Sequence, residues 1–403
     1  MNQAQEIAEQ TAALRPYFDR LQKRAFTVGG IGLVILAISA FVDPQQFFRS
    51  YLLGFLFCMG LPMGSLAILM LHHLAGGTWG FAIRRLLEAA ARTAPLVLIF
   101  FIPVLLGMHE LYEWSHPEAV ARDPVLLQKS GYLNVPFFLV RAAIYFAIWL
   151  TLSFLLNKWS LQQDATINTA PTRRMQKISG PGIILFMLTM TLASVDWIMS
   201  LEPHWFSTIY GLIFIIGQGL LTWTFMTIVA VQLSEKKPLS GLLTNQRLRD
   251  LGTLTLAFVL LWTYTSFSQL LIIWSANLPE EITWYMTRLH GGWRYLGVLL
   301  MLFHFAVPFL LLVSSQIKAK TRALTAIASG LIVMRLVDLY WITAPAMHHS
   351  GLEPHVLDLV APLALGGIFV GAFFWQLKNR SLIALNDPRF PDLIGKDSGP
   401  HHG

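Results

Sequence analysis

Apolar residues run in long stretches along this chain instead of alternating with polar ones. Ten stretches have roughly the 20 residues that an α-helix needs to cross the hydrocarbon core of a membrane. We predict helices, because backbone polar groups in lipid must be satisfied within the segment, and the period-two alternation of a transmembrane barrel is absent. The predicted spans are residues 25–42, 51–71, 89–108, 132–156, 178–199, 206–232, 250–275, 293–315, 321–343 and 356–377.

The segments outside the spans are short, and no soluble domain interrupts the series. Residues 1–24 carry Leu14, Phe18 and Leu21 at helical spacing, which predicts an amphipathic helix lying at the membrane interface. We therefore expect an interfacial segment over 1–24, a ten-helix membrane domain over 25–377 and a loose Pro-, Asp- and Gly-rich tail over 378–403.

Composition supports a membrane protein and narrows its chemistry. Hydrophobic residues make up 55% of the 403 positions and charged residues 13%, about half the share in a soluble domain, which excludes a disordered chain and argues against a soluble enzyme. The single thiol, Cys58, cannot close an internal disulfide, attach a c-type haem, or hold an iron–sulfur cluster or a four-cysteine zinc site.

Basic residues are distributed unevenly between the two sides of the predicted spans. The segments on the side of the N-terminus carry 22 of the 29 Lys and Arg residues, and the opposite loops carry five. Because short cytoplasmic loops are enriched in Lys and Arg, we predict that both termini are cytoplasmic and read the net charge of +7 as an orientation signal.

Ionisable residues inside a span are costly and are functional candidates by default. His304 lies near the middle of the eighth span. Arg335 and Asp338 lie three residues apart in the ninth span, on one helix face where they can neutralise each other. Arg141 lies a little outside the midplane of the fourth span.

Further polar groups lie at the span ends. On the outer side, Asp196 closes the fifth span and Asp358 opens the tenth, and on the inner side His72 and His73 end the second. Acidic groups thus gather in the outer half, with His304 between the two sides. This distribution predicts a proton path of two half-channels that meet near His304.

Structural roles stay open for the same residues. Arg335 and Asp338 can form an ion pair that only holds helices together, and His304 can form a hydrogen bond across helices. Carboxylates at the interface, such as Asp196 and Asp358, cost little and can cap helices. His72 and His73 can simply face lipid headgroups.

Cofactor sites within this chain receive little support. Haem b needs two imidazoles at matching depth, and only His304 is deep. His109, Glu113 and His116 fall on one face of a predicted loop helix and could ligate a metal, although a solvated helix is the favoured interpretation, so we predict no metal. Phosphate-binding, dinucleotide-binding and serine-nucleophile motifs are absent.

The most distinctive stretch, residues 194–211 (SVDWIMSLEPHWFSTIYG), joins the fifth and sixth spans. Together with the HGGWRYLG segment at 290–297 and the ten-span plan, it resembles the second large membrane subunit of bacterial alternative complex III, a quinol:electron-acceptor oxidoreductase of the bacterial cytoplasmic membrane. The resemblance covers essentially the whole chain. This subunit is related to polysulfide-reductase-type membrane anchors, which implies two four-helix bundles, at about 51–199 and 206–343, with the first and last spans flanking them.

The resemblance also implies a division of labour among subunits. The iron–sulfur clusters and c-type haems belong to partner subunits, and a sister ten-helix subunit carries the better-supported quinol site. We therefore expect this chain to bind no cofactor of its own and to be structural and proton-conducting.

Two other functions remain as alternatives. The chain could itself bind quinol in an outer pocket, with His204, Asp196 and Trp197 as the candidate residues. It could also be a stand-alone secondary transporter, but the sequence lacks clearly broken half-helices at corresponding positions of two repeats.

Overall fold

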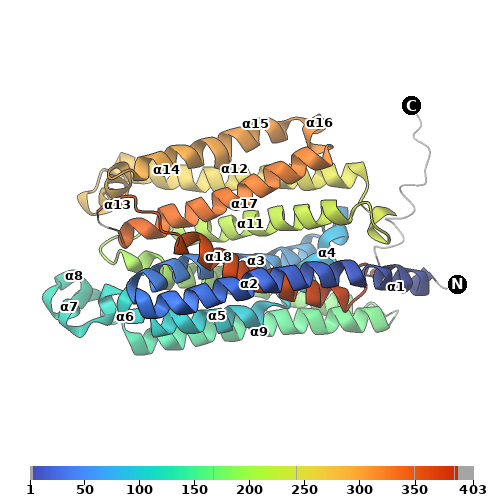
Figure 1. Cartoon of the computed structure of the whole chain (residues 1–403), viewed down its shortest axis with the longest axis horizontal. Helices are drawn as coiled ribbons and strands as arrows, with labels where there is room; N and C mark the ends of the chain where they lie inside the picture. Colours follow the sequence, from blue (N-terminus) through green and yellow to red (C-terminus); the bar gives the residue numbers. More distant parts are fainter. Residues whose placement is uncertain (1–2, 167, 242, 349, 385, 389–403) are drawn as a thin grey trace.

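The computed structural model describes residues 3–388 apart from positions 167, 242, 349 and 385, and this part of the chain contains helices and no strand. Residues 389–403 of the predicted tail therefore lie outside the described residues. Long helices run side by side along one axis (Figure 1). We call the end where α1 and the last turn of α18 lie the terminal end, and the opposite end, with α6–α8 and α13, the loop end.

The described helices confirm an all-α, multi-pass membrane protein. Nine are long and apolar enough to cross a membrane, and a tenth crossing results if a bent pair, α4 and α5, counts as one span. The helices that cross singly are α2 (Arg15–Val42), α3 (Pro44–Ala75), α9 (Val135–Ala165), α10 (Ala170–Trp197), α11 (Tyr210–Leu233), α12 (Asn245–Ala276), α14–η4–α15 (Trp293–Val313), α17 (Thr321–Thr343) and α18 (Leu357–Lys378). Short elements connect them: α1 (Gln3–Ala13), α6 (Met108–Leu111), η1 (Glu113–Ser115), α7 (Pro117–Arg122), α8 (Pro124–Lys129), η2 (Met199–Leu201), η3 (Leu239–Gly241), α13 (Pro279–Leu289), α16 (Ser315–Lys318) and η5 (Ala344–Ala346).

The predicted interfacial helix over residues 1–24 is wrong in its extent. The break falls at Leu14, and α2 begins at Arg15, ten residues before the predicted start of the span. Pro16 suits this start, because backbone N–H groups in the first turn of a helix have no acceptor within the helix and a residue without one loses no hydrogen bond there. Phe18 is buried, and its ring stacks on Phe374 of α18 at 5.9 Å.

The third predicted span is two helices. α4 (Thr78–Ala91) and α5 (Ala94–Leu106) meet at Arg92 and Thr93 with a bend of 41°. Pro95 follows the break in the first turn of α5, where its missing N–H costs nothing. Most of α4 therefore falls in the segment between the predicted spans 51–71 and 89–108. The sequence predicted an inner loop there, but the segment is a buried helix.

The eighth span contains a π-helical segment, η4 (Leu300–Ala306), between α14 (Trp293–Leu299) and α15 (Val307–Val313). Pro308 has no N–H to donate to the carbonyl of His304 four residues earlier. The helix widens just before this proline, and the widened turn carries His304.

Small residues let the first and last spans approach closely. A side chain at Gly32 of α2 would overlap Ala364 of α18, and one at Gly29 would overlap Ile368. Close backbone contact of this kind replaces the hydrophobic driving force that is missing between helices in lipid.

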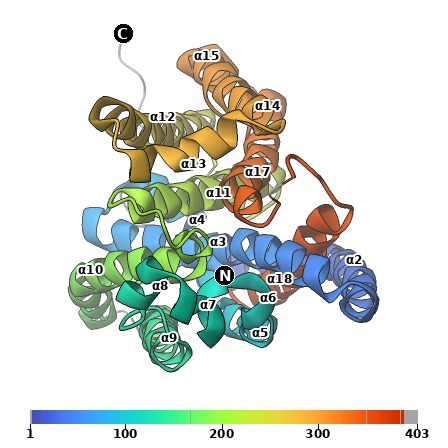
Figure 2. The same cartoon turned by 90° about the vertical axis from the view of Figure 1, so that its left-hand side faces the viewer.

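The helices fall into groups when viewed along the bundle axis (Figure 2). α3 packs against α5 and α10, and α10 packs against α9. α11 packs against α12 and α17, and η4 and α15 complete that second group. α11 also contacts α3, which joins the groups, and α2 and α18 pack on each other and on α3.

Candidate functional site

The most deeply buried charges of the second helix group are Arg335 and Asp338 on α17. Both side chains are buried, and Arg335 Nη1 donates a short hydrogen bond to Asp338 Oδ2. Gly217 of α11 faces the guanidinium so closely that a Cβ there would overlap it. The ring of Phe214 lies 5.7 Å from Arg335 Cζ. The predicted pairing of the two residues is therefore present, and α11 provides its space.

His304 lies beside this pair, in the π-helical turn. Its imidazole is buried and stacks on the indole of Trp262 from α12, with centroids 4.0 Å apart and planes 3° from parallel. Arg335 lies within electrostatic range of the ring. Trp262 also faces Asp338, without hydrogen-bond geometry for its N–H. His304, Arg335 and Asp338 thus form one cluster. Trp262 of α12 packs against it, between η4 and α17.

Tyr210 is a further buried polar residue, between the cluster around His304 and the loop end. It is the first residue of α11, is buried, and lies within electrostatic range of both the Arg335–Asp338 pair and the Glu202–Arg288 pair. The tyrosine therefore stands between a deep ion pair and a shallower one.

The shallower ion pair joins Arg288 of α13 to Glu202. Arg288 Nη2 donates to Glu202 Oε2 at 3.0 Å, and the same guanidinium donates to the carbonyls of Trp341 at 3.1 Å and Ile342 at 3.0 Å. Arg288 is buried, whereas the Glu202 side chain is 24% exposed. Arg288 thus ties the end of α17 to α13, and Glu202 remains open on one side.

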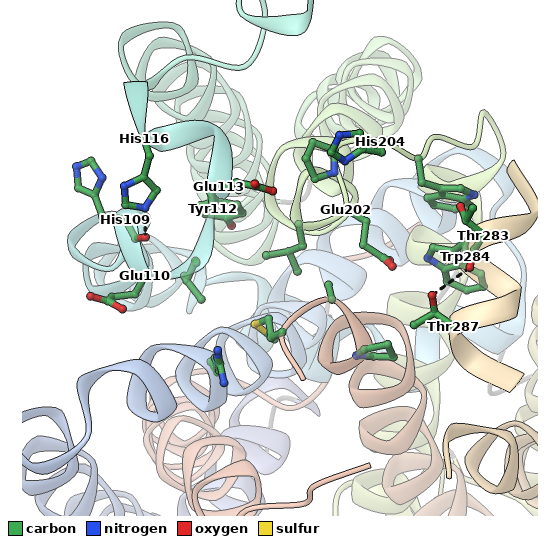
Figure 3. Close-up of a pocket in the computed structure, with 18 residues that line it drawn as sticks. His109, Glu110, Tyr112, Glu113, His116, Glu202, His204, Thr283, Trp284 and Thr287 are labelled. Atoms are coloured by element: carbon green, nitrogen blue, oxygen red, sulfur yellow. Dashed lines mark hydrogen bonds between the residues drawn. The ribbon is translucent and has the colours of Figure 1, made fainter. Parts of the chain in front are cut away.

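Glu202 opens into a pocket of about 590 Å³ at the loop end (Figure 3). In Figure 3 the carboxylates of Glu202 and Glu113 point into the space between the α6–η1 segment and α13. The polar lining residues are Arg49, His109, Glu110, Tyr112, Glu113, His116, Glu202, His204, Thr283 and Thr287. The pocket, Glu202–Arg288, Tyr210, Arg335–Asp338 and His304 form a polar series from the surface into the helix bundle.

Arg141 and Asp196 form a separate ion pair in the first helix group. Arg141 Nε and Nη2 each donate to Asp196 at 2.9 Å, and the Tyr145 hydroxyl donates to it at 2.8 Å. The expectation of an inexpensive carboxylate at the interface is wrong for Asp196, which is fully buried. Arg141 also donates to the Tyr132 carbonyl at 2.8 Å, so the pair joins α9 to α10 and to the segment before α9.

Asp358 has a structural position at the start of α18. Its carboxylate accepts from the Ser50 hydroxyl at 2.6 Å and from the His355 backbone N–H at 2.9 Å. Gln46 in turn donates to Ser50 at 2.9 Å. These bonds fix the start of α18 on α3.

His72 and His73 lie near the terminal end of α3, where both are buried. The His72 ring contacts the Trp79 ring at 5.6 Å, and a Cβ at Gly80 would overlap the imidazole. The headgroup-facing interpretation is therefore wrong, because both residues are buried, and α4 covers His72.

The three residues of the quinol alternative do not share one surface. His204 is half exposed, lines the pocket and contacts Asp123 Oδ2 at 2.6 Å. Trp197 is buried among the rings of Phe101 and Phe55, at 4.8 and 5.5 Å, and Asp196 is bound by Arg141.

Asp123 is the N-cap of α8 and lies outside the spans. Desolvation alone would raise the pKa of its carboxyl, but the backbone N–H groups of Leu126 and Val125 and the ring of His204 together hold that pKa below its usual value. The contact with His204 thus links the α7–α8 segment to the loop after α10.

The metal alternative lacks the geometry that the sequence suggested. His109 and His116 do not lie on one helix, because Tyr112 is extended between α6 and η1. His116 Nε2 instead lies 2.7 Å from the His109 carbonyl. Within the described part of the chain, no group of three His, Cys, Asp or Glu side chains could hold a metal ion.

A buried ionic cluster near the terminal end was not predicted from the sequence. Arg84 of α4 donates to Glu88 at 2.8 Å and to Asp387 at 2.6 Å, and Arg85 binds Glu88 and Asp164. The arginines were counted as loop cations, but both are buried. Their spacing of three and four residues from Glu88 was the available signal.

A scan of known protein families finds no match to this chain, and a search of curated proteins finds none either.

Proposed function

We propose that this chain is a membrane subunit of a quinol:electron-acceptor oxidoreductase, similar to the second large membrane subunit of bacterial alternative complex III, and that it conducts protons. The observation that carries the proposal is the polar series from the loop-end pocket through Glu202, Tyr210 and Asp338 to His304. Buried ionisable groups are expensive in a membrane and typically mark proton or ion paths.

Each step of the series suits proton movement. Glu202 is open to the pocket and can exchange a proton with water. Tyr210 provides a hydroxyl between the two ion pairs, and the imidazole of His304 can accept or release a proton at the inner limit of the series. Arg288 and Arg335 are fixed positive charges that stabilise the carboxylates beside them.

The proposed orientation places both termini in the cytoplasm and the pocket on the periplasmic side of the bacterial cytoplasmic membrane. The excess of Lys and Arg at the terminal end supports this orientation. Arg84 and Arg85 are buried in ion pairs and contribute little to that signal, but the excess remains large without them.

The proposed partners are a sister ten-helix membrane subunit, an iron–sulfur subunit and c-type cytochromes of one complex. The lone thiol, Cys58, is buried, so redox centres would reside in those partners and this subunit would hold none. The packing of α3, α5, α9 and α10 beside α11, α12, α15 and α17 supports the two-bundle plan of polysulfide-reductase-type anchors.

Membership in the complex is tested by mild affinity purification from native membranes. We expect c-type haem and iron–sulfur signals to co-purify with this chain. A colourless chain that purifies alone under conditions that preserve a known respiratory complex would refute the proposal and favour the transporter alternative.

The proton path is tested by His304→Ala combined with Asp338→Asn in the complex reconstituted into vesicles. We expect assembly and quinol oxidation to persist while protons moved per electron fall. Glu118→Gln is the matched control, because this carboxylate is also at the loop end but is 87% exposed. An unchanged proton-to-electron ratio in the double variant would refute the path.

The quinol-binding alternative has less support. Of its three residues only His204 lines the pocket, whereas Asp196 and Trp197 are buried in the first helix group. A photoreactive quinone that labels this chain beside His204 would revive it.

A further inference from the structure

The ionic cluster near the terminal end, together with two neighbouring arginines, carries more positive charge than the described carboxylates neutralise. Arg92, at the break between α4 and α5, and Arg380, just after α18, join the buried cluster of Arg84, Arg85, Glu88, Asp164 and Asp387. Four guanidinium groups therefore face three carboxylates.

Hydrogen-bond donors of this arginine group are buried without an acceptor. Arg84 is bonded through all three nitrogens, but Arg85 Nε, Arg92 Nε and Arg380 Nη1 have no partner in the described part of the chain. Arg92 is held in place because its Nη2 donates to the Gln376 carbonyl at 2.8 Å. Buried donors on a charged group are costly to leave unpaired, so an anion bound to them would stabilise the arrangement.

The two outer arginines also repel each other. Arg92 and Arg380 lie within electrostatic range of each other, and each residue as a whole is only partly buried, although Arg92 Nε and Arg380 Nη1 are themselves buried. Arg380 lies outside the spans, and burial lowers the pKa of its guanidinium. An anion bound between the two side chains would accept from both and remove the repulsion.

Their position along the membrane normal identifies the source of the anion. α18 has 22 residues and spans about 33 Å at ~1.5 Å per residue, close to the thickness of the hydrocarbon core, so its ends reach the interface. Trp375, one turn before the end of α18, is 48% exposed, as expected for a tryptophan at headgroup level. Arg380 follows that end by two residues.

We propose that Arg92 and Arg380 bind the phosphate of an anionic phospholipid at the terminal end of α18. Guanidinium groups are well suited to phosphate, because their planar donors match its oxygens, and basic pockets beside membrane helices bind such headgroups. The site is independent of quinol oxidation and of the proton path.

The first test measures thermal unfolding of the wild-type chain in mild detergent as lipid is added. A ligand that binds only the folded state raises the melting temperature in a saturable way. We expect this with phosphatidylglycerol and not with phosphatidylcholine. Both lipids carry a phosphate, but only the headgroup of phosphatidylglycerol has a net negative charge. An equal rise with both lipids would overturn the proposal, because the site would then not select anionic headgroups.

The second test compares variants in the same titration. We expect Arg92→Gln with Arg380→Gln to raise the apparent Kd for phosphatidylglycerol at least tenfold, whereas Arg174→Gln, an exposed arginine at the same end, leaves it unchanged. Arg380→Gln alone serves if the double variant does not fold, because Arg380 lies outside the helices, and a smaller loss is then expected. Unchanged affinity in whichever of these variants folds overturns the site.

A third arm separates the two sources of phosphate. Inorganic phosphate should leave the melting temperature of the wild type unchanged at the concentrations that saturate phosphatidylglycerol. If inorganic phosphate gives the same shift and the variants abolish it, the site takes free phosphate and the lipid assignment is wrong.

Discussion

The imidazole of His304 lies flat on the indole of Trp262, with ring centroids 4.0 Å apart and an interplanar angle of 3°. The two residues come from the π-helical turn of the eighth span and from the middle of α12, and both are buried. Trp262 therefore fixes the ring plane of His304, which lies deep in the second helix group.

Trp262 is expected to stabilise the fold through this contact. Trp262→Ala should lower the free energy of unfolding by about 3–5 kcal/mol, the usual cost of removing a buried aromatic side chain. Thermal or denaturant unfolding in detergent measures the change. Trp274→Ala on the same helix is the control, because that indole is 70% exposed and its loss should have little effect. Equal losses in both variants would contradict a specific role for Trp262.

Gly217 is expected to accept no side chain, because its α carbon faces the Arg335 guanidinium. Gly217→Ala should destabilise the protein by about 1–3 kcal/mol, since the new methyl group displaces a buried charge. Gly330→Ala on α17 is the matched control, because nothing lies within 4 Å of its added Cβ. There the higher helix propensity of alanine should leave stability unchanged or slightly raised. Both variants can be compared by thermal unfolding.

The Arg141–Asp196 pair should be structural. Asp196→Ala leaves a buried guanidinium without its carboxylate and should cost about 3–5 kcal/mol, and adding Arg141→Met should recover part of this loss. A double-mutant cycle of unfolding free energies gives the coupling between the two residues. Protons moved per electron should stay normal in the fraction that folds. A lower ratio there would place this pair in the proton path.

Glu202 should be the opening of the proposed proton path. Glu202→Gln keeps a hydrogen-bond acceptor for Arg288 but removes the exchangeable carboxyl proton, so proton release into the loop-end space should slow severalfold. Glu110→Gln is the control, because Glu110 lines the same pocket and no contact joins it to Arg288. Proton release from reconstituted vesicles measures both variants. Equal slowing by both would assign the effect to pocket charge in general.

The α7–α8 segment should loosen in acid. Backbone N–H groups and His204 lower the pKa of Asp123 in the folded protein. The carboxylate therefore stabilises the segment fully at every pH above the ordinary carboxyl pKa, neutral pH included. It is lost as the pH falls through the lowered value. Hydrogen exchange of residues 117–129, corrected for the intrinsic rate, should therefore rise in that range. In Asp123→Asn, whose amide oxygen can still accept from the capped N–H groups but does not titrate, the protection should not change across that range, and a transition that persists in this variant would implicate another group.

Part of the candidate site was accessible from the sequence and part was not. His304, Arg335 and Asp338 stand out because they are ionisable within apolar runs, and the spacing of Arg335 and Asp338 predicts their pairing. Glu202 falls among the acidic groups that gather in the outer half, but Arg288 did not stand out, because it lies in a segment that reads as a water-exposed loop. Only the fold shows that Arg288, in the last turn of α13, is buried.

The sequence by itself determined the class and the span pattern of this protein. A run of apolar residues long enough to cross a membrane must form a helix, since no other local structure satisfies its backbone there. Hydropathy therefore predicts the all-α class, and nine of the ten predicted spans are single helices in the described part of the chain. Only the tertiary structure decided which polar residues meet. Hydropathy does not fix the rotation of a helix about its axis. Helix packing sets that rotation, and so separates Asp196 and Asp358 from His304, joins His304 to Asp338 and Arg335, and buries Arg84 and Arg85 at the terminal end.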